Sequence, residues 1–194
     1  MTTTKTAPSS TTATNGSSRN GHSGKAVAPN VLSTPTDLNA EGVQEIVAAI
    51  NPLVADAFAL YVKTKNFHWH LASSHFRDYH LMLDEQADQI FATIDPLAER
   101  VRKIGGTTIR SIGHIASLQT TKDANEDFVL PIEMLSRLME DNKSMAAHMR
   151  HAHEICDDHK DVATASLLEN FIDETERRTW FLFEVAQGGE HHTE

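Results

Sequence analysis

The chain has little cysteine and no long apolar run, and each shortage argues against a class of protein. Cys156 is the single cysteine among 194 residues, so no disulfide can form within one chain. This usage fits a reducing compartment and predicts a cytoplasmic protein. No apolar run approaches the length of a membrane span, and no apolar stretch near the N-terminus resembles a signal peptide. Neither a membrane protein nor a secreted protein is expected.

Acidic residues are absent from residues 1–36, which consist of small and polar residues with hardly any large apolar ones. Such a segment cannot bury enough surface to become ordered, so we expect a flexible N-terminal tail. Lys5, Arg19 and Lys25 give it a charge of +3 and leave −13 on the remainder, for a net charge of −10. A basic tail on an acidic body suits non-specific contacts with DNA phosphates, but is equally compatible with a merely solubilising tail.

Apolar residues recur at helical spacing in four long stretches between residues 37 and 187. Either Asp37 or Asn39 can cap the first helix. The other three helices are expected at residues 73–104, 129–157 and 160–187.

Residues 107–127 form a connection rich in Thr, Ser and Asp, with a short helix expected at residues 111–118. This length suits a crossover rather than a tight turn. Two helices, a long crossover and two more helices is the order of a ferritin-like four-helix bundle, so residues 37–187 are predicted to form that all-α fold. Residues 188–194 are expected to be a flexible C-terminal tail.

Two pairs of candidate metal ligands lie four residues apart in the second helix: His80 with Asp84, and Asp95 with Glu99. A spacing of four places both members of a pair on one face of a helix. At about 100° per residue, all four lie on one side, roughly 110° from the apolar stripe. The pairs cannot meet within one chain, because at about 1.5 Å per residue their midpoints are roughly 22 Å apart.

The two pairs are placed symmetrically along the helix, because residue numbers 80 and 99 have the same sum, and so the same midpoint, as 84 and 95. Two antiparallel copies of this helix, related by a two-fold axis, would place His80 opposite Glu99 and Asp84 opposite Asp95. An isologous dimer makes every contact twice and so creates two identical sites. The alternative is that these residues are the solvated polar face of a surface helix.

His68, at the end of the first helix, adds a fifth ligand to each site. Two imidazoles with three carboxylates suit iron, manganese or zinc. The usual ferritin-like centre inside a bundle uses Glu-x-x-His motifs. No Glu in a predicted helix is followed by His three residues later, which favours the site between subunits.

The run KTKNFHWH at residues 63–70, then His80 and Asp84, then DPLAER ahead of IGG, resembles the Dps family, the mini-ferritins. The resemblance extends over roughly residues 38–187. In that family the ferroxidase centre lies between two-fold-related subunits. The resemblance implies that His68, His80 and Asp84 of one subunit bind iron and act catalytically together with Asp95 and Glu99 of its neighbour.

The same resemblance places Trp69 beside the first ligand. It also implies a twelve-subunit cage, hydrogen peroxide as the favoured oxidant, storage of ferric mineral and protection of DNA. His70 departs from the family pattern, since many members have asparagine there. This histidine leaves the ligands intact but adds an ionisable group near the site.

A second ionisable cluster closes the third helix and includes Asp157, Asp158 and Asp161. Negative side chains at a helix C-terminus oppose the macrodipole, so their presence needs a reason. The resemblance supplies one, an acidic pore at a three-fold axis through which iron enters. A solvated helix end is the alternative.

The sequence therefore predicts an iron-oxidising and iron-storing protein. Two alternatives remain open at this point: a DNA-compacting chromosomal protein in which metal chemistry is secondary, and a structural metal site that only holds a dimer together.

Overall fold

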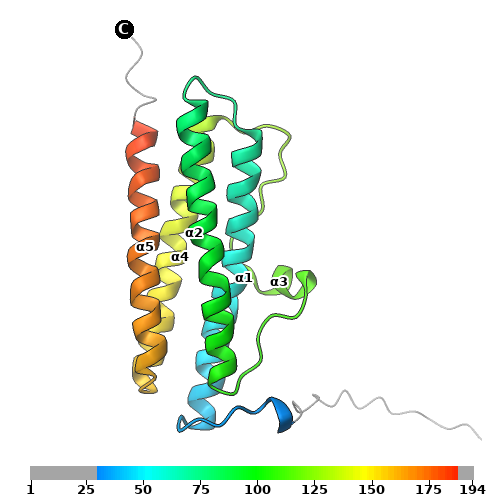
Figure 1. The fold of residues 1–194 in the computed structure, drawn as a ribbon, viewed down its shortest axis with the longest axis vertical. Coiled ribbons are helices and arrows are strands. Elements are labelled where there is room, and N and C mark those ends of the chain that lie inside the picture. Colours follow the sequence, from blue (N-terminus) through cyan, green and yellow to red (C-terminus); the bar gives the residue numbers. More distant parts are fainter. Residues whose placement is uncertain (1–29, 188–194) are drawn as a thin grey trace, which may run out of the picture.

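The computed structural model describes residues 30–187, which form a bundle of long helices and contain no strand (Figure 1). The long helices are α1 (Ala40–His70), α2 (Phe76–Lys103), α4 (Pro131–Asp158) and α5 (Val162–Gln187). A 3-10 helix at Asn30–Leu32 precedes them, and the short helix α3 (Ile112–Leu118) lies in the connection between α2 and α4. The all-α fold and the order of its elements are as predicted.

Helix α1 packs against α2, and α4 packs against α5, so the bundle consists of two helix pairs. The pairs join chiefly through α1 and α4. The crossover that joins α2 to α4 contains α3, which packs against the side of α1 (Figure 1). The buried carboxylate of Asp56 on α1 holds the part of the crossover that directly follows α3, accepting hydrogen bonds from the backbone N–H groups of Thr120 (2.6 Å) and Thr121 (2.7 Å).

The helix ends follow local capping rules. Asn39 caps α1 by accepting a hydrogen bond from the Gly42 N–H at 2.8 Å, which decides between the two predicted caps. Helix α2 ends at Lys103, and two residues later Gly105 has a φ of +87°, a left-handed conformation that favours glycine. The next residue, Gly106, donates its N–H to the carbonyl of Val101 at 2.9 Å, so the chain leaves α2 in a defined direction.

One continuous core fills the space between the four long helices. Its fully buried members come from every long helix and include Ile50, Leu60, Leu83, Leu97, Leu135, Leu138 and Leu168. Burial of such a side chain stabilises the fold by about 1.5–3 kcal/mol. This packing leaves the polar face of α2 on the outside of the bundle. The four candidate ligands of that helix lie on this face: His80, Asp84, Asp95 and Glu99.

Helix α1 differs from the expectation that no apolar stretch approaches the length of a membrane span. It contains an 18-residue window with a mean hydropathy of 1.5, long and apolar enough to meet the criterion for a membrane span. In the bundle, 44% of that window is buried inside the protein. The helix therefore uses much of its apolar surface to contact α2 and α4.

Residues 30–36, which the sequence analysis assigned to the N-terminal tail, include backbone that contacts the end of α2. The guanidinium of Arg102 on α2 donates a hydrogen bond to the carbonyl of Leu32 at 2.9 Å. Thr34 lies close to Gly105, so its backbone runs along the end of α2. The segment that joins the 3-10 helix to α1 is thus attached to the bundle, which composition alone could not indicate.

Candidate metal centre

Three of the five predicted ligands meet where α1 ends and α2 begins. The imidazole rings of His68 and His80 stack with their centroids 3.7 Å apart. The Nε2 atom of His68 lies 3.8 Å from a carboxylate oxygen of Asp84. His68 is buried, whereas Asp84 is about half exposed, so the cluster opens at the surface of the bundle.

The backbone orients both imidazoles in the same way. The Nδ1 atom of His68 lies 2.9 Å from the carbonyl oxygen of His80, and the Nδ1 atom of His80 lies 3.1 Å from the carbonyl of His68. A carbonyl can only accept, so each Nδ1 carries the proton and donates it. Each neutral ring therefore keeps a lone pair on Nε2, which is the arrangement that a second hydrogen bond gives to metal-binding histidines.

A lysine that the sequence pattern did not single out completes this cluster. Lys65, one turn before His68 on α1, donates a hydrogen bond to the carboxylate of Asp84. This hydrogen bond lowers the pKa of Asp84 and raises the pKa of Lys65. Asp84 is therefore held as an anion. The Lys65 ammonium binds the carboxylate that was predicted to bind a metal ion. The i, i+3 spacing of Lys65 and His68 is the signal in the sequence that could have identified it.

The other two predicted ligands lie farther along α2 on its exposed surface. Both Asp95 and Glu99 are exposed, and Glu99 forms an ion pair with Lys103 at 2.9 Å. Within residues 30–187, no three His, Cys, Asp or Glu side chains are grouped closely enough to hold a metal ion. One copy of the chain therefore offers half of the predicted site, and the other half lies roughly 22 Å away along the helix.

The other two residues of the HWH run, Trp69 and His70, are exposed at the surface. The Trp69 side chain is 65% exposed at the surface. The Nδ1 atom of His70 donates to the carbonyl of Asn66, one turn earlier in α1, at 2.8 Å. The departure at position 70 thus has a local role that leaves the ligand cluster undisturbed.

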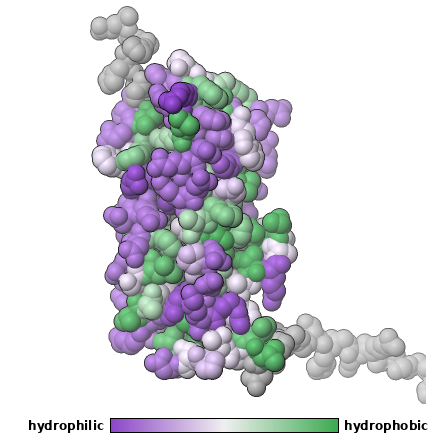
Figure 2. Space-filling view, viewed as in Figure 1, coloured by the Kyte–Doolittle hydropathy of each residue, from purple (hydrophilic) through white to green (hydrophobic). Residues whose placement is uncertain are grey.

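Several large apolar side chains are exposed on the same two helices as these residues. Hydrophobic patches interrupt a largely hydrophilic face of the bundle in Figure 2. Large apolar side chains that α1 and α2 leave exposed are Val62, Trp69, Phe76, Leu81 and Phe91. Exposed apolar surface of this kind is typical of a protein–protein contact.

Comparison with known proteins gives a consistent result. The ferritin-like domain family matches residues 47–189 of this chain. A low temperature-induced protein of Nostoc sp., itself uncharacterized, is 31% identical over 152 residues, covering 78% of this chain and 85% of that protein. A DNA protection during starvation protein of Brevibacillus brevis is 31% identical over 141 residues, covering 72% of this chain and 94% of that protein. The chain belongs to the Dps family of ferritin-like proteins.

The fold of this Dps chain is also close to a solved member of the family. The structure of DpsC from Streptomyces coelicolor aligns with a TM-score of 0.75 at 27% identity, covering 78% of this chain and 88% of that one. The family resemblance seen in the sequence is therefore confirmed.

The acidic cluster of this Dps chain divides in the structure. Asp157 and Asp158 are exposed at the end of α4, but Asp161 is buried. Asp161 caps α5, accepting from the Thr164 N–H at 3.1 Å, and pairs with the Arg100 guanidinium at 2.6 Å. A cap and an ion pair account for Asp161 fully, so only the other two aspartates face outward as a pore requires.

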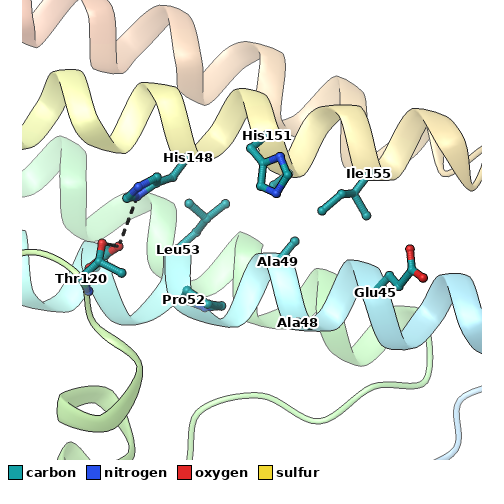
Figure 3. Close-up of a pocket in the computed structure, with 11 residues that line it drawn as sticks. Glu45, Ala48, Ala49, Pro52, Leu53, Thr120, His148, His151 and Ile155 are labelled. Carbon is teal, nitrogen blue, oxygen red and sulfur yellow. Dashed lines mark hydrogen bonds and ion pairs between the residues drawn. The ribbon is translucent and has the colours of Figure 1, made fainter.

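A groove of about 510 Å³ runs between α1 and the second half of α4 (Figure 3). His148 lies at one end, 3.8 Å from Asp56, and Glu45 lies at the other end. The floor between them is apolar, with Leu53 and Ala49. The ionisable groups are spread along the groove, so it lacks the convergent ligands of a metal site.

The predicted DNA contacts of the N-terminal tail, Lys5, Arg19 and Lys25, lie outside the residues that the structure describes. The same is true of the predicted C-terminal tail at residues 188–194.

Proposed function

We propose that this Dps chain oxidises ferrous iron at sites shared by two copies of the chain, stores the ferric product within an oligomeric cage and so protects DNA. One observation carries the proposal. The reciprocal hydrogen bonds of His68 and His80 leave two Nε2 lone pairs beside the ionised carboxylate of Asp84. This donor set suits Fe(II), and it is incomplete within one chain.

The missing carboxylates are supplied by a second copy. Asp95 and Glu99 are exposed on α2, as a two-fold contact through this helix requires. In that dimer, Glu99 of each copy lies opposite His80 of the other. Exposed apolar side chains on α1 and α2 provide the surface that such a dimer buries. On the family pattern, dimers of this kind assemble into a twelve-subunit cage.

Iron is the substrate of this reaction. The site binds Fe(II) with mixed nitrogen and oxygen ligands, and each ferrous ion loses one electron to the oxidant, for which the family resemblance favours hydrogen peroxide. Carboxylate oxygens favour the ferric product. Its hydrolysis releases protons and forms the mineral that the cage retains. A peroxide molecule that accepts one electron from each of two ferrous ions yields water rather than hydroxyl radical. This is how the reaction would protect DNA.

The shared site can be tested by mixing two inactive variants. His80→Ala with Asp84→Ala removes one half-site, and Asp95→Ala with Glu99→Ala removes the other. Each variant alone should lose fast iron oxidation, because every site in its dimers lacks two ligands. Refolded together at equal amounts, half of the dimers are mixed and one of their two sites is intact. Peroxide-driven Fe(II) oxidation should return to about a quarter of the wild-type rate.

A matched control uses Glu140→Ala with Lys143→Ala, exposed residues of α4 outside the proposed site. This variant should keep full activity alone and give no complementation pattern. If the mixture of half-site variants stays inactive while subunit exchange is demonstrated, the shared site is wrong. Full activity in either half-site variant alone would contradict the ligand assignment.

DNA compaction is the second candidate, and the +3 charge of residues 1–36 favours it. A third is a structural metal that only holds the dimer. Gel retardation alongside the oxidation assay separates DNA compaction from iron chemistry. Dimers that persist after complete metal removal would exclude the purely structural role.

A further inference from the structure

Two long polar side chains are buried on neighbouring helices of the bundle. Arg178 on α5 is 2% exposed, and Gln86 on α2 is 3% exposed. Next to them in sequence, Arg177 and Glu85 lie 3.8 Å apart on the surface of the same two helices. Each buried residue follows one member of this surface pair, so Gln86 and Arg178 each lie within about one residue rise, roughly 1.5 Å, of that pair along neighbouring helices.

The charge of Arg178 has only neutral partners. Its Nε–H donates to the side-chain oxygen of Asn142 at 2.9 Å, and its Nη2 donates to the hydroxyl of Thr175 at 2.7 Å. Neither acceptor is a carboxylate. The acid that acts on it electrostatically is Glu174, which is exposed on the outside of α5. An arginine in a protein interior is normally paired with an anion, because an unpaired buried charge is costly.

Deprotonation does not remove this charge. Burial lowers the pKa of Arg178 to about 10, which is still well above neutral pH. The guanidinium therefore remains a cation at pH 7 inside the bundle. A group that brings negative charge lowers the cost of this burial more than a neutral group does.

These two buried side chains carry unused hydrogen-bonding atoms. The Nη1 atom of Arg178 has no hydrogen-bond partner among the described residues, and neither the nitrogen nor the oxygen of the Gln86 amide has one. Buried polar atoms are almost always hydrogen-bonded, so a cluster of three without partners needs an explanation. Two of them are donors, on a cation and on an amide, and donors together with positive charge recognise an anion.

We propose that the bundle binds a small monovalent anion, such as chloride, between the guanidinium of Arg178 and the amide N–H of Gln86. The anion neutralises the buried cation and accepts both unused donors. This site is separate from the iron ligands at the surface of α2, and it does not depend on the iron chemistry. Its role is to stabilise the bundle core, so the stability of the protein should depend on chloride.

Crystals of the full chain grown in sodium bromide give a direct test, because bromide replaces chloride and scatters anomalously. We expect an anomalous peak in each subunit, within hydrogen-bonding contact of Arg178 and Gln86. Arg178→Met should abolish the peak, and the matched surface variant Arg177→Met should retain it. Gln86→Leu, which keeps the cation and removes one donor, should lower the occupancy and covers the case in which Arg178→Met fails to fold.

Melting curves in sodium chloride and in sodium gluconate of equal ionic strength test the site in solution, since gluconate is too large for a closed core. Ligand binding to the folded state raises the melting temperature as ligand concentration rises. Wild type and Arg177→Met should melt higher in chloride, and Arg178→Met should melt equally in both salts. A core without an anomalous peak, whether it holds water or a direct bond between the two side chains, overturns the proposal. Equal melting of the wild type in the two salts does so as well.

Discussion

At the scale of single residues, the balance between Lys65 and Asp84 decides how readily the site accepts a cation. Within one chain, Lys65 donates to the carboxylate that would bind iron. Both partners of this pair are partly exposed to solvent, so the pair itself contributes little stability. Its consequence is competition, since ammonium and Fe(II) need the same oxygen.

Replacing Lys65 with Gln should therefore strengthen metal binding near neutral pH by about two- to fivefold, the range expected for one partly exposed ion pair. In acid this advantage of the variant shrinks. The hydrogen bond from Lys65 lowers the pKa of Asp84, so in the variant this pKa returns toward its ordinary value. The carboxylate of the variant then protonates at a higher pH, so its gain in metal affinity over the wild type shrinks as the pH falls through that range.

Anaerobic titration calorimetry with Fe(II) at several pH values measures both effects. Lys143→Gln, which removes a comparable surface pair with Glu140, serves as the control and should bind like the wild type. Unchanged affinity in Lys65→Gln across the whole pH range would show that this lysine does not compete with the metal.

At the scale of elements, the junction of α4 and α5 combines a structural aspartate with two exposed ones. Asp161 caps α5 and ties it to α2 through Arg100. We expect Asp161→Ala to destabilise the protein by about 2–4 kcal/mol, because it removes a cap and leaves the partly buried guanidinium of Arg100 without its carboxylate partner. Asp157→Asn with Asp158→Asn should leave the stability near that of the wild type.

The same pair of variants separates folding from iron uptake. If the exposed aspartates attract iron, the double variant should slow uptake by about tenfold at low Fe(II) and low salt, and the effect should shrink as salt is added. Thermal melting and stopped-flow uptake assays provide the two measurements. Uptake at the wild-type rate in the double variant would place the route of iron elsewhere, and wild-type stability of Asp161→Ala would contradict its assignment as a cap.

At the scale of the whole molecule, the charge is divided between a basic N-terminal segment and an acidic body, +3 against −13. If Lys5, Arg19 and Lys25 bind DNA phosphates, deletion of residues 2–29 should abolish retention of DNA in gels. This deletion ends before residues 30–36, because Leu32 contacts the bundle through Arg102. Retention by the full chain should fall steeply with salt, since binding depends on counterion release.

The control for this deletion is the triple variant Lys5→Gln, Arg19→Gln and Lys25→Gln, which keeps the length of the segment. It should behave like the deletion if charge is responsible. Iron oxidation should be unchanged in both variants, because the proposed site lies on α1 and α2. DNA retention equal to the wild type after deletion would exclude the segment as the DNA contact.

The sequence by itself determined the features that depend on local rules. Helical periodicity, the cap at Asn39 and the glycines after α2 specify the helices to within a few residues, because capping and amphipathic patterns act over one or two turns. The spacing of His80 and Asp84 likewise places both on one face of α2, since four residues make about one helical turn. The tertiary structure decided what depends on residues distant in sequence. It took Asp161 from the acidic cluster into a cap and ion pair, placed Lys65 against Asp84, and brought Glu85 of α2 to the height of Arg177 of α5. These contacts depend on how whole helices pack against one another, and no local pattern specifies that height or rotation.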